Sequence, residues 1–151
     1  MSEIEAALLA SDPVWETLGS HFDEDEQPLP RIVAQLTAIV GEVTPLYVQT
    51  SLEHADRPGE IKIEVFAIWD HLVTATALAG GDVGTTVAAR SSLRTVQLRN
   101  APIAGRDDSA LEGFLSFTDL GDIRVPSNRE HVPLREQLAV VFPLLMADLA
   151  K

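Results

Sequence analysis

The part of the sequence that follows Pro45 most constrains the fold. It is divided by turn-forming residues into short segments rich in β-branched and aromatic side chains. Such a pattern is typical of antiparallel strands joined by tight connections. It predicts seven strands, at about residues 46–53, 60–69, 72–79, 84–90, 93–99, 111–118 and 121–126. Most of the intervening segments have the length of hairpin loops.

Helical patterns precede these strands. Ser2 and Glu5 have the spacing of a capping box, and a second short helical turn is predicted after Pro13. The acidic run at residues 23–26, followed by Pro28, neither packs nor propagates a helix easily. We therefore divide the chain into an acidic N-terminal helical arm and linker, residues 1–28, and a single α+β domain, residues 29–151.

Two further helices are predicted within that domain. Residues 29–40 repeat apolar side chains at helical spacing and end at Gly41, a favoured C-terminal cap. Residues 133–149 form an amphipathic C-terminal helix. The predicted fold is α+β: an antiparallel seven-stranded curved sheet, or a two-sheet barrel, with a C-terminal capping helix and two N-terminal helices.

The charge of the chain excludes several classes of partner. Eleven Lys and Arg oppose 23 Asp and Glu, which gives a formal net charge of −12. A field of that sign repels nucleic acid and anionic lipid. No apolar run has the length of a membrane span. We expect a cytoplasmic protein that binds neither nucleic acid nor membrane, and the excess of Arg over Lys suggests a bacterial source.

The sequence contains no recognisable catalytic or metal-binding motif. Cysteine is absent, which excludes disulfides and thiol chemistry. The four histidines show no metal-ligand spacing, and the glycine cluster at residues 80–84 lacks the Lys and Ser or Thr of a phosphate loop. We therefore name no catalytic residue, metal ligand or cofactor, and expect a protein that is not an enzyme.

The strongest candidate binding residues are arginines. Residues 83–106 contain four arginines and no acidic residue. If residues 84–90 and 93–99 pair as a hairpin, Arg90 and Arg94 flank its turn and Arg99 lies at its far end. Forked guanidinium groups suit an acidic peptide, an anionic small molecule or the chain's own acidic segment. The alternative is that these arginines serve solubility and local ion pairs.

The strand at residues 60–69 has two faces that need cover. Its odd-numbered residues are apolar, whereas its other face begins with Lys62 and Glu64 and finishes with Phe66 and Ile68. The helix at residues 29–40 offers an apolar stripe for this second face. A partner protein or a second copy of the chain offers another, so Phe66, Ile68 and Trp15 are candidate interface residues.

Seven short antiparallel strands followed by one amphipathic helix resemble the pleckstrin-homology-like barrel. The resemblance covers residues 46–150, and residues 111–126, which lead through a tight turn into the terminal helix, are its most suggestive part. Family members that bind phosphoinositides use basic residues around the first hairpin, where this chain has His54 and Arg57 among three acids. The resemblance therefore implies an interaction scaffold. Small acidic secretion chaperones are a second, lower-ranked resemblance.

These patterns leave three functional hypotheses. The first is a non-enzymatic protein-interaction or scaffold domain that binds another protein or a peptide, with residues 1–28 as a docking arm. The second is a small-molecule or anion-binding domain, which includes an enzyme with its cavity inside the curved sheet. The third is an acidic, chaperone-like partner-binding protein. A homodimer formed through Phe66 and Ile68 is compatible with the first and third.

Overall fold

The computed structural model describes residues 2–54, 61–78, 83–102, 109–128 and 130–150. It confirms an α+β fold with seven antiparallel strands in two sheets. Sheet A has the order β1 (Tyr47–His54), β2 (Ile61–Ile68), β3 (His71–Leu78) and β4 (Val83–Ala89). Sheet B has the order β5 (Leu93–Pro102), β6 (Ser109–Phe117) and β7 (Gly121–Val125). Arg57, Arg106 and most of the glycine cluster at 80–84 lie outside the described residues.

The helices begin and end close to their predicted limits. They are α1 (Glu3–Ser11), α2 (Trp15–Leu18), α3 (Pro28–Val40) and α4 (Val132–Leu149). The Ser2 hydroxyl accepts a hydrogen bond from the Glu5 amide and so caps α1. Gly41 ends α3 with a positive φ, which residues with a Cβ rarely adopt. These local signals were readable because capping depends on residues close together in the sequence.

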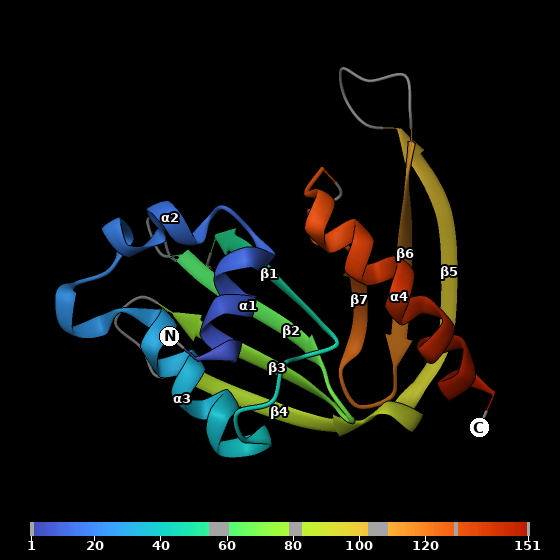
Figure 1. Ribbon diagram of the computed structural model, residues 1–151, viewed down its shortest axis with the longest axis horizontal. Helices are drawn as coiled ribbons and strands as arrows, with labels where there is room; N and C mark the ends of the chain where they lie inside the picture. The colour runs from blue at the N-terminus through green and yellow to red at the C-terminus, as the bar shows by residue number, and fades with distance from the viewer. Residues whose placement is uncertain (1, 55–60, 79–82, 103–108, 129, 151) are drawn as a thin grey trace.

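The predicted hairpin between residues 84–90 and 93–99 is wrong. β4 pairs with β3, and β5 pairs with β6. Between β4 and β5 a short helical turn at Arg90–Ser92 redirects the chain, so that β5 begins the second sheet. Figure 1 shows the strands of sheet B running steeply across those of sheet A. The two-sheet alternative therefore describes the protein.

The N-terminal helices cover one face of sheet A (Figure 1). The odd-numbered residues of β2 point into this layer, and they pack with α1, α2 and α3 around Leu8, Leu18, Ile32 and Leu36, which are fully buried. Polar contacts join the same elements: the Thr50 hydroxyl of β1 lies 2.9 Å from the Ser11 hydroxyl and accepts a hydrogen bond from the Trp15 indole. Residues 4–22 are thus part of this core.

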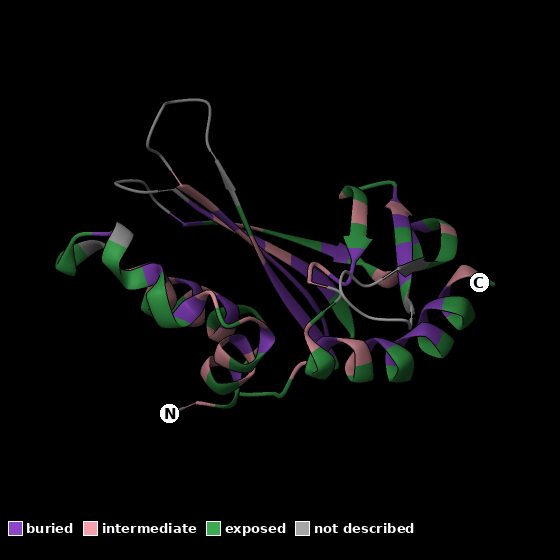
Figure 2. Ribbon diagram, turned by 90° about the horizontal axis from the view of Figure 1, so that it is seen from above, coloured by how far each residue is buried: buried purple, intermediate pink, exposed green. Residues whose placement is uncertain are grey.

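The opposite face of sheet A packs on sheet B and α4. This second core contains Phe66, Ile68, Leu72, Leu115, Phe117, Leu134, Leu138, Val141, Phe142 and Leu145. Figure 2 shows buried residues concentrated along sheet A and on the inner side of α4. The helix approaches β6 closely at Gly113, where a Cβ would lie only 3.0 Å from the Phe142 ring.

The interface predicted for Phe66, Ile68 and Trp15 needs correction. Phe66 and Ile68 are 4% and 1% exposed in the second core, and Trp15 is 8% exposed in the first. The helix at residues 29–40 was expected to cover the Phe66 and Ile68 face, but α3 packs on the odd-numbered face of β2. Sheet B and α4 cover the Phe66 and Ile68 face, so the single chain covers both faces of β2. Within the part of the chain that is described, no helix is long and apolar enough to cross a membrane.

Candidate ligand-binding cleft between the two sheets

The face of sheet A that meets sheet B changes from apolar to polar along its strands. At one end Ile68 pairs with Leu72 and is buried. Two residues further along each strand, Phe66 pairs with Gln49 and Thr74, and beyond them Glu64 pairs with Ser51 and Thr76. Because side chains alternate between faces, all of these residues lie on one side of the sheet. Sheet B covers the apolar end and leaves the polar end open.

A cavity of about 510 Å³ lies where this polar end meets the edge of sheet B. We call it the inter-sheet cleft. It is lined by Gln49, Ser51, Glu64, Val65, Phe66, Thr74, Ala75, Thr76, Leu120, Asp122, Ile123, Arg124 and Ser127. A smaller cavity of about 240 Å³ shares Arg124 and Ser127 with it. Pockets of the larger size accept small organic ligands.

Gln49 lines the cleft and joins the two sheets. Its side-chain oxygen accepts hydrogen bonds from the Tyr47 hydroxyl, at 2.6 Å, and from the Ser127 amide, at 3.0 Å. Its side-chain nitrogen donates to the Arg124 carbonyl at 3.0 Å. The side-chain amide thereby pairs with backbone groups in and just after β7, the outer strand of sheet B. The relative position of β1 and β7 depends on this residue.

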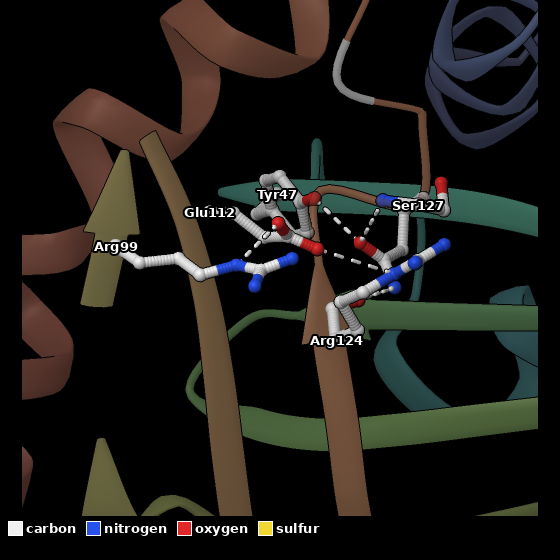
Figure 3. Close-up of polar contacts among 6 residues, drawn as sticks. Tyr47, Arg99, Glu112, Arg124 and Ser127 are labelled. Atoms are coloured by element: carbon white, nitrogen blue, oxygen red, sulfur yellow. Dashed lines mark hydrogen bonds and ion pairs between the residues drawn. The ribbon is translucent and has the colours of Figure 1, made fainter. Parts of the chain in front are cut away.

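Glu112 positions the arginine at the mouth of the cleft. Its carboxylate is 2% exposed and lies 3.0 Å from Arg99 Nε and 3.6 Å from Arg124 Nε (Figure 3). A buried carboxylate needs such partners, because its desolvation is otherwise costly. The Arg99 guanidinium also lies over the Phe114 ring, 5.7 Å from its centre. Arg124 is therefore held on one side by Glu112 while it lines the cleft.

The arginines predicted to form one binding surface have separate partners. Arg90 donates to the buried Asp148 carboxylate at 2.7 Å, and Arg94 donates to the Thr118 hydroxyl. Arg99 pairs with Glu112 and does not line the cleft. Since the hairpin assumed for them does not form, they have no common turn. Local pairing, the alternative considered from the sequence, describes the contacts of all three.

The charges of the cleft disfavour an anion. Two carboxylates, Glu64 and Asp122, line it together with one guanidinium, Arg124. Glu64 lies 2.8 Å from Lys62 Nζ, and Asp122 accepts a hydrogen bond from the Ser116 hydroxyl. The remaining polar groups are hydroxyls and an amide, which act as neutral donors and acceptors. Among the described residues, no three side chains of the metal-ligating types cluster in space.

Alkaline titration is expected to reveal the burial of Tyr47, the only tyrosine of the chain. Burial raises the pKa of its hydroxyl well above the usual 10.0. The folded protein then holds this proton more tightly than the unfolded chain, so the stability it contributes is complete below about pH 10 and falls as the pH rises further. Tyrosinate absorbance should therefore appear together with the loss of circular dichroism. A folded protein with an ordinary tyrosinate titration would contradict the burial.

Sequence reasoning missed Gln49, Glu112 and Arg124. One signal was present: Lys62 and Glu64 begin the strand face that ends with Phe66 and Ile68, which indicates a surface only half covered. The partners across the cleft, on β7, could not be inferred without knowing the strand pairing. Comparison of the chain with protein-family models, with curated proteins and with solved structures found no match.

Proposed function

We propose that this protein is a binding domain for a small, uncharged, hydroxyl-bearing molecule that occupies the inter-sheet cleft. The observation that carries the proposal is the polar end of sheet A, which is left open between the two sheets and lined by Gln49, Ser51, Thr74 and Thr76. Ser51, Thr74 and Thr76 are half-buried and line the cleft with hydroxyl groups, which can donate hydrogen bonds to a bound molecule and accept them from it.

The ligand class follows from the composition of the lining. Hydroxyl and amide groups alternate with the apolar surfaces of Phe66, Leu120 and Ile123. A saccharide or nucleoside presents the same mixture of hydroxyl groups and apolar faces. We expect phosphorylated molecules to bind less well, because Arg124, the cation of the lining, is already paired with Glu112, and Asp122 lies in the same lining. The proposal corresponds to the small-molecule alternative that was considered from the sequence. It does not involve Arg90, Arg94 and Arg99, the residues that had suggested an anionic ligand.

The test is ligand-observed nuclear magnetic resonance with a panel of monosaccharides, disaccharides and nucleosides, each compared with its phosphorylated counterpart. We expect saturable binding of uncharged members. Replacement of Thr76→Phe should fill the cleft and raise Kd at least about tenfold, which corresponds to about 1.4 kcal/mol. Thr86→Phe is the matched control, since Thr86 pairs with Thr74 on the same face of sheet A but does not line the cleft.

Three results would reject this function. The first is that no uncharged member of the panel binds. The second is equal or tighter binding of the phosphorylated molecules, which would contradict the charge argument. The third is binding that survives Thr76→Phe in a folded variant.

The pleckstrin-homology-like resemblance stays a prediction. A four-stranded and a three-stranded sheet followed by a C-terminal helix have the element order that it requires. Members of that family that bind phosphoinositides use basic residues around the first hairpin. In this chain the corresponding loop lies outside the described residues. The proposed cleft does not depend on this resemblance, because it is built from described residues of β1, β2, β3 and β7 and from Leu120 and Ser127, which flank β7.

A further inference from the structure

A second cavity, which we call the α3 pocket, lies where the chain passes from α3 into β1. Its volume is about 320 Å³, and it is lined by Ile39, Val40, Val43, Thr44, Leu46, Trp69, Asp70 and His71. It shares no residue with the inter-sheet cleft. A molecule bound in one cavity therefore leaves the lining of the other free.

Three apolar side chains of the α3 pocket are exposed. Ile39 is 38% exposed, Val43 is 52% exposed and Leu46 is 42% exposed. Single exposed apolar residues are normal, but several that surround one cavity mark an interaction site. Ile39 belongs to the apolar repeat of α3, yet it lies outside the core that Ile32 and Leu36 enter.

Hydrogen bonds hold the pocket in shape. The Trp69 indole, 5% exposed, donates to the Val43 carbonyl at 2.8 Å. Residues 41–46 connect α3 to β1. At the two ends of this segment, the Gly41 amide donates to the Thr37 carbonyl and the Leu46 amide donates to the Ile68 carbonyl, each at 2.8 Å. A site that is already ordered spends less conformational entropy when a partner binds.

Acidic residues lie in the lining of the pocket and next to lining residues. Asp70 lines it and is exposed, and Glu42 is exposed beside Val43. The Glu3 carboxylate accepts a hydrogen bond from the hydroxyl of Thr44, another lining residue. His71 is the one titratable base in the lining. The charges around the pocket therefore complement a basic partner, and so does the formal net charge of −12.

We propose that the α3 pocket docks a segment of a partner protein that inserts one large apolar side chain and places Lys or Arg residues on either side of it. A protein segment is favoured over a small molecule because Glu42 and Glu3 lie outside the cavity lining, where only an occupant that extends beyond the cavity reaches them. A second copy of the chain would bring its own excess of carboxylates against these acids. The interaction role expected from the sequence is thereby assigned to this surface.

The test is selection of a random heptapeptide library, displayed on phage, against the full chain and against Leu46→Glu. We expect enriched peptides with one large apolar residue beside Lys or Arg. Synthetic versions should shift the Trp69 fluorescence in a Trp15→Phe background, where Trp69 is the only tryptophan. Leu46→Glu should weaken binding at least about tenfold, and added salt should weaken it further, since exposed charges are screened.

The matched control is Val140→Glu, which places the same charge at an exposed apolar residue of α4. It should bind the selected peptides as the unmodified protein does. The proposal is overturned if no peptide is enriched, if the enriched peptides lack basic residues, or if a folded Leu46→Glu variant binds them equally well. A dimer of the unmodified protein that is lost in Leu46→Glu would overturn it in favour of a second copy.

Discussion

Removal of residues 1–27, after which the chain begins at the first residue of α3, is expected to abolish cooperative unfolding. The deletion takes away five buried apolar side chains of the first core: Ile4, Leu8, Trp15, Leu18 and Phe22. At about 1.5 to 3 kcal/mol for each, their burial contributes roughly as much as the whole stability of a typical domain, about 5 to 15 kcal/mol. It also exposes the odd-numbered face of β2, including Ile63 and Val65. Circular dichroism during urea denaturation measures the outcome.

A graded variant separates packing from gross disruption. Leu8→Ala keeps every backbone contact and should lower the free energy of unfolding by about 2 to 5 kcal/mol, the usual range for a fully buried leucine. Leu144→Ala is the matched control, because Leu144 is 37% exposed on α4 and its replacement should change stability far less. A truncated chain with an unchanged unfolding midpoint would show instead that residues 1–28 are a separable arm, as the division proposed from the sequence requires.

Replacement of Arg90→Met is expected to cost about 3 to 5 kcal/mol, the range for breaking a buried ion pair on one side. Arg90 donates to Asp148 at 2.7 Å, and their side chains are 20% and 4% exposed. Asp148 lies in the last turn of α4, where the helix dipole already disfavours a negative charge. Without Arg90, the carboxylate is left buried and unpaired, which weakens the contact between α4 and the turn that joins the two sheets.

The double replacement Arg90→Met with Asp148→Leu identifies the cause. It removes both charges from the buried position, so most of the lost stability should return, and the non-additivity measures the pair directly. Arg94→Met serves as the control, since Arg94 is exposed and donates to the exposed Thr118 hydroxyl. Urea unfolding of the unmodified protein, of Arg90→Met, of Asp148→Leu, of the double variant and of Arg94→Met provides the data. Equal losses for Arg90→Met and Arg94→Met would show that burial of Asp148 does not govern the effect.

The sequence indicated the two candidate sites to very different degrees. For the cleft, the change from Lys62 and Glu64 to Phe66 and Ile68 along one strand face was visible before the fold was known. For the α3 pocket, Ile39 read as a core residue because it fits the helical repeat, although Ile32 and Leu36 already fill the contact with sheet A. Periodicity marks which residues share a face but does not state where the covered part of that face ends.

The sequence by itself determined the elements of this protein. Capping at Ser2, the glycine at residue 41, the turns and the alternation of side chains act over a few residues, so seven strands and the flanking helices were readable from it. Only the tertiary structure decided which strands share a sheet, because hydrogen bonds between strands join residues far apart along the chain. The tertiary structure also decided what covers Phe66 and Ile68. The alternation of side chains shows that this strand face must be buried, but it does not show what buries it. In this protein, sheet B and α4 of the same chain bury it, and not a partner.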